Sequence, residues 1–288
     1  MAGTGSRRGV LPDSSANADA EVVKGFGDEW SRFDHSTMSP EELNEMWENY
    51  FHLFPWNRLP ADAMGFDLGC GSGRWARLVA PRVGRLHLID PSAEALEVAK
   101  RNLADAGNCD FHLAAVDQLP IPENSADFGY SLGVLHHIPD TVAGLRACVS
   151  RLKPGAPFLL YLYYSFDNRP WWYRAIWKAS DILRRTVSVQ PLALRHFLSE
   201  ILAVTIYWPL SRLSRLGEAL NLDVSNWPLS WYRNRSFYVL RTDALDRFGT
   251  RLEKRFSQAE IRQMMTQAGL IDIRFSDRSF WTAVGFRA

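Results

Sequence analysis

The sequence has few cysteines and almost no excess charge. Its 288 residues include three cysteines, Cys70, Cys109 and Cys148, and their spacing matches no metal-ligand motif. An odd number also argues against a complete internal disulfide framework, so we expect a reducing compartment, the cytoplasm. Thirty-three Lys and Arg face 32 Asp and Glu, a net charge of +1. The chain as a whole therefore has no charge that would attract it to nucleic acid or to an acidic surface.

Long apolar runs and an apolar leader are also missing. A membrane-spanning helix takes roughly 20 consecutive apolar residues, and no stretch of this chain reaches that length. Arg7 and Arg8 are not followed by the apolar run of a signal peptide. We therefore expect no membrane span. Residues 1–20 are mostly small or polar, with almost nothing to bury, and predict a disordered tail.

The stretch from residue 66 to 76 has the pattern of a buried strand, a tight turn and the start of a helix. Gly69, Gly71 and Gly73 remove the Cβ atoms where the backbone must fold back sharply, and Asp67 closes the strand. Dinucleotide-binding turns have the spacing G-x-G-x-x-G, whereas this turn has G-x-G-x-G with a carboxylate two residues before it. Because that carboxylate would repel a diphosphate, the turn predicts a ligand with a cationic or zwitterionic group.

Four motifs, in the right order, resemble the class I S-adenosylmethionine-dependent methyltransferases. They are D-L-G-C-G-S-G at 67–73, L-H-L-I-D-P-S at 86–92, A-D-F-G-Y-S-L-G-V-L-H-H-I-P-D at 126–140 and L-K-P-G at 152–155. The resemblance covers about residues 60–163 and returns from Phe256 to the C-terminus. It implies S-adenosylmethionine as cofactor, S-adenosylhomocysteine as product and no metal, in an enzyme of the small-molecule type.

The order of the segments and the resemblance together predict an α/β fold: a Rossmann-like, seven-stranded, mostly parallel sheet with helices on both faces and an inserted, mainly helical cap. The strands are expected at 63–68, 85–90, 110–115, 126–132 and 158–164, with a closing antiparallel pair at 270–276 and 281–286. We divide the chain into a tail (1–20), an N-terminal helical lid (21–60), a cofactor-binding core (61–164), the cap (165–255) and a C-terminal helix with closing strands (256–288).

The lid segment contains a helical stripe of five large residues, which fits either core packing or closure over the cofactor. They are Leu43, Met46, Trp47, Tyr50 and Phe51.

Asp67 and the backbone of the glycine turn are expected to hold the methionine end of the cofactor. Asp90 lies about 20 residues beyond the turn, at a strand end where a carboxylate accepts hydrogen bonds from ribose hydroxyls. The alternative for Asp90 is a helix N-cap.

The adenine contact departs from the family pattern. Where relatives often carry an acidic residue, this chain has Ala115. We therefore expect Val116 to pack on the ring and Asp117 or a backbone group to meet the amine; alternatively, Asp117 is a solvated loop acid. Leu132, at the end of the fourth strand, completes the expected cofactor site.

The fourth strand leads into His136 and His137, beside the expected methyl donor. Imidazole titrates near neutrality, which suits a base that removes a proton from a hydroxyl; the alternative is a structural pair. Relatives that methylate sugar hydroxyls pair such a histidine with an acid after the fifth strand, and Asp167 is this chain's candidate. The segment 131–134, S-L-G-V, lacks the paired prolines that hold a flipped base in nucleic-acid amino-methyltransferases, so no nucleic-acid partner is expected.

The cap is the part of the chain that lies outside the family resemblance. Residues 165–255 hold six of the eleven tryptophans and 15 Lys and Arg against 8 Asp and Glu, a local charge of +7. We expect this basic, aromatic cap to bind a small-molecule acceptor, with a hydroxyl or amine receiving the methyl group. Alternatives are a homodimer face, an RNA or protein substrate, and an interfacial contact with a membrane through 201–210 in a lipid or quinone methyltransferase.

Overall fold

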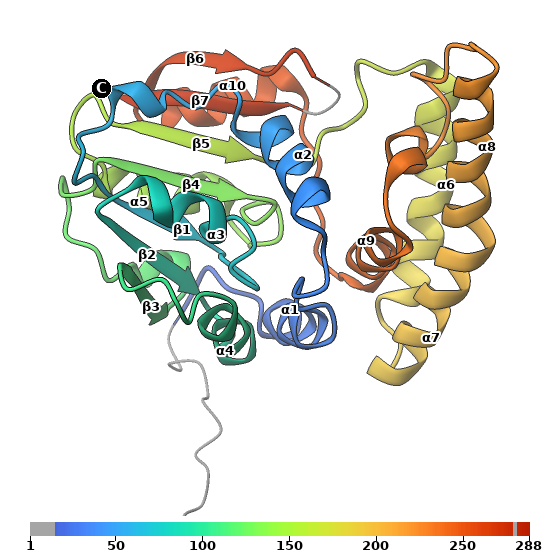
Figure 1. The fold of residues 1–288 in the computed structure, drawn as a ribbon, viewed down its shortest axis with the longest axis horizontal. Coiled ribbons are helices and arrows are strands. Elements are labelled where there is room, and N and C mark those ends of the chain that lie inside the picture. Colours follow the sequence, from blue (N-terminus) through green and yellow to red (C-terminus); the bar gives the residue numbers. More distant parts are fainter. Residues whose placement is uncertain (1–14, 279–280) are drawn as a thin grey trace, which may run out of the picture.

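The centre of the molecule is a seven-stranded sheet in the order β3-β2-β1-β4-β5-β7-β6 (Figure 1). The computed structural model describes residues 15–278 and 281–288. Strands β1 to β5 are parallel, and β7 runs antiparallel to both β5 and β6. The predicted mostly parallel sheet is thereby confirmed. The strands are β1 (Met64–Leu68), β2 (Arg85–Asp90), β3 (Cys109–Leu113), β4 (Phe128–Leu132), β5 (Pro157–Tyr161), β6 (Leu270–Phe275) and β7 (Thr282–Arg287).

Alternate side chains of the strands enter two different cores, one on each face of the sheet. Phe66 and Leu68 of β1 pack in a core closed by α5 (Thr141–Arg151) and α10 (Gln258–Gln267). Leu86 and Leu88 of β2 pack in a second core, with α2, α3 and α4. These helices span Pro40–Phe51, Ala76–Val79 and Ala93–Asn102. The sheet is therefore covered by helices on both faces, as predicted.

Helix α2 carries the large residues of the lid segment. Leu43, Met46, Trp47 and Phe51 are buried in the second core, and Tyr50 packs beside them, 5.0 Å from the Trp75 ring. The stripe is therefore a packing stripe, the first of its two alternatives. The N-terminal segment also contains α1 (Ala20–Arg32), which precedes α2, and closure over the cofactor stays a prediction for that helix.

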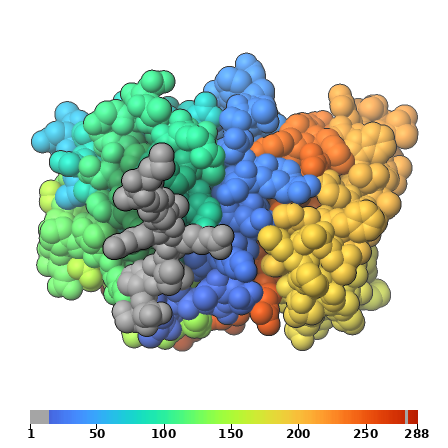
Figure 2. Space-filling view, turned by 90° about the horizontal axis from the view of Figure 1, so that it is seen from below, coloured from blue at the N-terminus to red at the C-terminus, as the bar shows by residue number. Residues whose placement is uncertain are grey.

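Helix α1 lies between the sheet domain and the cap (Figure 1). It packs against α4 of the sheet domain and α9 of the cap. Seen from below, the residues coloured blue form a column between the two halves of the molecule (Figure 2). The predicted tail at 1–20 lies partly outside the described residues, but Ser15 and Ala16 bind Asp117, and the Asn17 side chain donates to the Asp140 carbonyl. Residues 15–20 thus differ from the expected disorder because their polar groups find partners on the core.

The cap is mainly helical, as predicted, and has its own apolar core. Its helices are α6 (Trp171–Val187), α7 (Leu192–Leu202), a π-helical turn (Ala203–Tyr207), α8 (Trp208–Ala219), a 3₁₀ turn (Ser230–Asn234) and α9 (Phe237–Gly249). Val187, Leu202, Tyr207, Leu240 and Phe248 meet in this core. Helix α9 is the inner layer, facing α1, and α6 to α8 form the outer layer (Figure 1). No helix of the described residues is long and apolar enough to cross a membrane.

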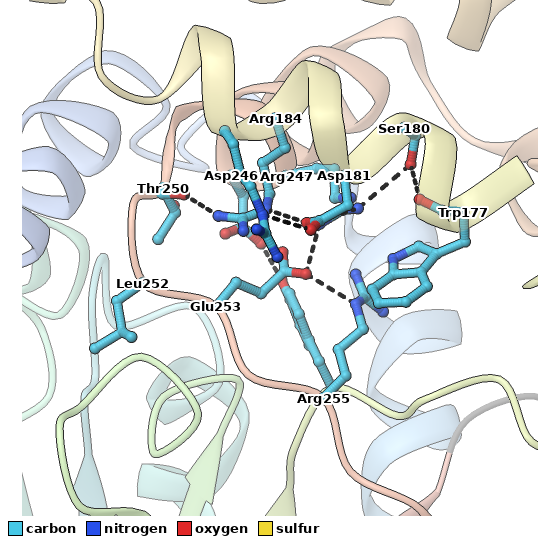
Figure 3. A network of polar contacts seen from close by, with 12 residues as sticks. Trp177, Ser180, Asp181, Arg184, Asp246, Arg247, Thr250, Leu252, Glu253 and Arg255 are labelled. Carbon is cyan, nitrogen blue, oxygen red and sulfur yellow. Dashed lines mark hydrogen bonds and ion pairs between the residues drawn. The ribbon is translucent and has the colours of Figure 1, made fainter.

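A buried ion cluster fixes the segment by which the chain leaves the cap (Figure 3). The Glu253 carboxylate, whose side chain is 1% exposed, accepts from Arg247 at 2.5 Å and from Arg255 at 2.8 Å. Arg184 of α6 donates to the backbone carbonyls of Thr250 and Arg251. Since each buried charge here has an opposite charge or a carbonyl against it, the segment 250–255 is held in one conformation.

We predict that Glu253→Gln lowers the free energy of unfolding by about 3 kcal/mol, because it leaves the buried Arg255 without its carboxylate and leaves Arg247 with only Asp181, at 3.8 Å. The matched control is Glu218→Gln. Its carboxylate pairs with Arg233 at the surface, and its loss is expected to leave the free energy of unfolding nearly unchanged. Urea unfolding followed by circular dichroism measures both. Equal, small losses in the two variants would contradict the structural role of Glu253.

Candidate functional site

The turn after β1 has the backbone that its glycines require. Gly69, Gly71 and Gly73 have φ values of 72°, 53° and 73°, in the left-handed region that residues with a Cβ rarely adopt. A Cβ on Gly69 would lie 2.4 Å from the Val134 side chain. The turn is tied to β2 by a 2.7 Å hydrogen bond from the Gly69 amide to the Ile89 carbonyl. It therefore brings bare backbone to the carboxyl end of the sheet, where open α/β sheets bind ligands.

Asp67, the last but one residue of β1, is a buried carboxylate with an unused oxygen. It is 2% exposed, and its Oδ2 has no hydrogen-bond partner among residues 15–278 and 281–288. Burial raises the pKa of Asp67 to about 8, the adjacent Tyr130 hydroxyl opposes that rise, and the Asp90 charge adds to it. A buried acid without a cation is suited to a ligand that brings one.

Asp90 sits at the carboxyl end of β2 and binds the glycine turn. Its Oδ2 accepts from the Gly71 amide at 3.0 Å and its Oδ1 accepts from the Ser92 amide at 2.9 Å. The side chain that caps α4 is Ser92, which accepts from the Ala95 amide, so the N-cap alternative applies to Ser92 and not to Asp90. Each carboxylate oxygen of Asp90 keeps a lone pair, and burial raises its pKa to about 6.

The contacts of the other expected cofactor residues do not point to a particular role. Val116 is buried in the 3₁₀ turn Val116–Gln118, and Leu132 is half-buried at the end of β4. Asp117 is exposed, and its two oxygens accept from the Ser15 hydroxyl and the Ala16 amide. Its expected contact with the adenine amine stays a prediction, as do the roles of Val116 and Leu132.

The N-terminal segment lies directly on the glycine turn. A Cβ on Gly71 would meet the indole of Trp30 at 2.9 Å. His35 Nδ1 and Ser72 Oγ are 2.9 Å apart, and the Phe26 ring lies 4.9 Å from the His137 ring. Helix α1 and the residues after it therefore cover both the turn and the histidine pair, where a lid is expected.

The two histidines have different environments. His136 is fully buried, neither ring nitrogen has a hydrogen-bond partner among the described residues, and burial holds its pKa well below the usual value. Its ring packs on Tyr163 at 3.9 Å. His137 Nδ1 donates to the Leu252 carbonyl at 2.7 Å. Because a carbonyl only accepts, this bond places a proton on Nδ1.

The acid beside Nε2 of His137 is Asp246, not Asp167. Asp246 Oδ1, from α9 of the cap, lies 3.8 Å from His137 Nε2. Asp167 is exposed, and among the described residues it accepts only from the nearby Ser165 hydroxyl. Strand β5 ends at Tyr161, before the expected 164, and Phe166 turns inward with a φ of 58° to pack on Trp177. The structure therefore does not bring Asp167 to the histidine pair.

Asp246 belongs to a group of carboxylates that sequence reasoning missed. Burial raises the pKa of Glu29, and the charges of Asp246 and Asp243 raise it further. Asp243 accepts from the Tyr232 hydroxyl at 2.7 Å, and burial raises its pKa to about 6. Burial also raises the pKa of Asp246, against the opposing charge of His137. The available signal was two acids, three residues apart, among the apolar residues of α9.

One set of side chains among the described residues has the composition of a metal site. His87, Asp110 and His112 present ligand atoms within 4.8 Å of one another. They lie within β2 and β3, and Asp110 already pairs with Arg85. This set stands apart from the glycine turn and the His137 pair.

Comparison with known proteins identifies the segment that carries the motifs. A family model described as "Methyltransferase domain" matches residues 66–155. The ubiquinone biosynthesis O-methyltransferase of Xanthomonas axonopodis pv. citri is 33% identical over 103 residues, which are 35% of this chain and 43% of that protein. That of Idiomarina loihiensis is 24% identical over 162 residues, 48% of this chain and 65% of its own. The chain therefore spans less than half the length of the first relative.

The structure of human N-acetylserotonin methyltransferase in complex with SAM covers 93% of this chain and 58% of its own. It has a TM-score of 0.51 at 15% sequence identity. At that identity the likeness supports the shared fold alone.

The raised pKa of Asp67 gives a prediction for stability. Between about pH 4 and pH 8 the folded protein retains the Asp67 proton, which the unfolded chain has released. The free energy of unfolding should therefore fall as the pH rises through this window, by up to about 1.4 kcal/mol per unit from this group. Urea unfolding at pH 5, 6.5 and 8 should show a shallower fall for Asp67→Asn, and an unchanged fall for the exposed control Asp105→Asn. Equal slopes in all three proteins would contradict the burial of an uncompensated acid.

Proposed function

We propose that this chain, which belongs to the class I S-adenosylmethionine-dependent methyltransferases through its core domain, transfers a methyl group to a hydroxyl of a small molecule. The observation that favours a hydroxyl as the methyl acceptor is the environment of His137. Its Nδ1 is occupied by the Leu252 carbonyl, and its Nε2 faces the Asp246 carboxylate.

The residues at the carboxyl end of the sheet fit the proposed cofactor. Asp67 offers a buried, unpaired carboxylate oxygen to a cationic amino group. Asp90 offers one lone pair on each oxygen to the two ribose hydroxyls. The turn at Gly69–Gly73 allows close approach of a ligand to the backbone. When bound, S-adenosylmethionine supplies an electrophilic methyl group on a sulfonium ion.

His137 is the proposed general base. With S-adenosylmethionine bound, His137 Nε2 would take the proton of the acceptor hydroxyl as the methyl carbon exchanges its bond to sulfur for a bond to the hydroxyl oxygen, which leaves S-adenosylhomocysteine. The resulting imidazolium keeps its hydrogen bond to Leu252 and has the Asp246 carboxylate against its new proton, which stabilises the positive charge. Asp246 thus takes the role that the sequence suggested for Asp167.

The remaining contribution is alignment and the exclusion of water. Trp30 and Phe26 of α1 cover the glycine turn and His137, and displacement at carbon depends on holding the two reactants in line. The acceptor is expected to contact the cap. Because the matched family segment ends at residue 155, the cap, at 165–255, is where this chain's own acceptor choice should be encoded. The relatives' name, ubiquinone biosynthesis O-methyltransferase, also supports a hydroxyl as the acceptor group.

We predict that the purified chain binds S-adenosylmethionine and S-adenosylhomocysteine, and that Asp90→Ala weakens both about ten- to a hundredfold, since two hydrogen bonds to a charged group are lost. Isothermal titration calorimetry measures the affinities. Asp105→Asn, in the exposed turn after α4, is the matched control and should bind as the wild type does. Thermal unfolding verifies that Asp90→Ala is folded. Absence of binding by folded wild-type protein would refute the cofactor assignment.

We predict that His137→Asn lowers kcat about 100- to 10,000-fold without weakening cofactor binding, because only proton removal is lost. The assay is transfer of labelled methyl from S-adenosylmethionine to acceptors found by screening phenols, sugars and amines. His52→Asn, a half-buried histidine at the end of α2, is the matched control and should keep its rate. Full activity of His137→Asn would show that the acceptor needs no base, as for a deprotonated amine.

A further inference from the structure

The outer layer of the cap exposes an unusual amount of apolar surface. Of the 18 large apolar side chains that are exposed in the described residues, 15 lie between residues 171 and 222. Exposed apolar residues that gather on one side of a domain mark an interaction surface. We call this set the outer cap face; it comprises Trp171, Ile176, Ile182, Leu183, Val189, Leu194, Phe197, Ile201, Val204, Ile206, Trp208, Leu213, Leu216, Leu220 and Leu222.

The residues of the outer cap face lie on one side of the cap helices, and the opposite side of these helices packs in the cap core. Along α7, the π turn and the start of α8, exposed apolar residues recur every three or four positions at 194, 197, 201, 204 and 208. The opposite side contributes Leu202, Ala203 and Tyr207 to the cap core. On α6, Trp171 is 74% exposed and Ile182 is 71% exposed. The exposed residues are therefore additional to the cap's own core.

The charged side chains of α6, α7 and α8 that make no ion pair among the described residues are basic. The segment 171–222 contains three acids, and each is paired with an arginine of the protein: Asp181 with Arg184 and Arg185, Glu200 with Arg32 and Arg241, and Glu218 with Arg233. Arg174 and Lys178 of α6 and Arg215 of α8 are exposed and make no ion pair within 15–278 and 281–288. The outer cap face is therefore apolar with a positive charge.

We propose that the outer cap face docks the protein on the surface of a bilayer that contains anionic lipids. Amphipathic helices with large apolar residues and unpaired basic residues lie in the interface of such bilayers. The fold makes this combination, because the stretch at 201–210 has no basic residue of its own. The basic residues come from α6, which lies beside it in the outer layer, and from α8, into which the stretch continues (Figure 1). A second copy is disfavoured as occupant, since a twofold contact would bring the same unpaired cations together.

The test is cosedimentation of the full chain with vesicles of phosphatidylcholine alone and of phosphatidylcholine mixed with phosphatidylglycerol. We expect binding to the mixed vesicles that weakens as salt is raised. Phe197→Glu with Trp208→Glu should abolish binding. Ile271→Glu, an equally exposed residue at 51% on β6, is the matched control and should bind as the wild type does. Removing one cation with Lys178→Gln should weaken binding about fivefold.

Three results would overturn the proposal: no binding to mixed vesicles, equal binding to both kinds of vesicle at all salt concentrations, or equal losses in Ile271→Glu and the double variant. Sedimentation velocity without lipid tests whether a second copy of the chain occupies the face. If the wild type is a dimer that Phe197→Glu dissociates, and no vesicle binding is seen, the face is a dimer interface. If the double variant does not fold, Lys178→Gln and Arg215→Gln test the same surface with its apolar residues intact. Vesicle binding is measured without cofactor or acceptor, so its outcome is separate from that of the proposed activity.

Discussion

The pairing of Glu253 with two buried arginines is the interaction on which the site depends. It fixes the segment that leaves the cap, and that segment carries Leu252, whose carbonyl sets the protonated nitrogen of His137. Helix α9, which ends just before this segment, carries Asp246 to the other nitrogen. The cap therefore supplies both partners of a histidine that belongs to the sheet domain. A shift of the cap relative to the sheet would change the orientation and the charge of that ring together.

The part of the site near β1 and β2 could be predicted from the sequence because its determinants are local. The three glycines and Asp67 lie within seven residues, and Asp90 closes the next strand of the parallel sheet. A backbone with positive φ needs glycine whatever surrounds it. The mostly parallel sheet and its antiparallel closing pair were predicted from the order of the segments together with the family resemblance, whereas the order of the strands within the sheet was not predicted.

The acid beside His137 could not be predicted in this way. Asp167 was favoured because it follows the fifth strand closely, but the chain turns Phe166 inward and Asp167 outward. Asp246 is distant in the sequence, and tertiary contacts bring it to the pair: α9 packs against α1, and the segment after α9 binds the histidines through Leu252 and Lys254. Likewise, the composition of the cap gave its net charge but did not show which of its arginines form ion pairs with carboxylates of the same protein. The acid beside His137 and the pairing of the arginines both depend on tertiary contacts between residues far apart in the sequence, which no local pattern reveals.

The position of Trp30 has a consequence for the order of events. Its indole lies against Gly71, and Phe26 of the same helix lies against His137, so a ligand that approaches the turn from that side meets a closed surface. Entry from that side requires α1 to move away from α4 and α9, the two helices it contacts. Entry would then be limited by the rate at which this helix detaches. The observed association rate would level off at high ligand concentration instead of rising in proportion to it.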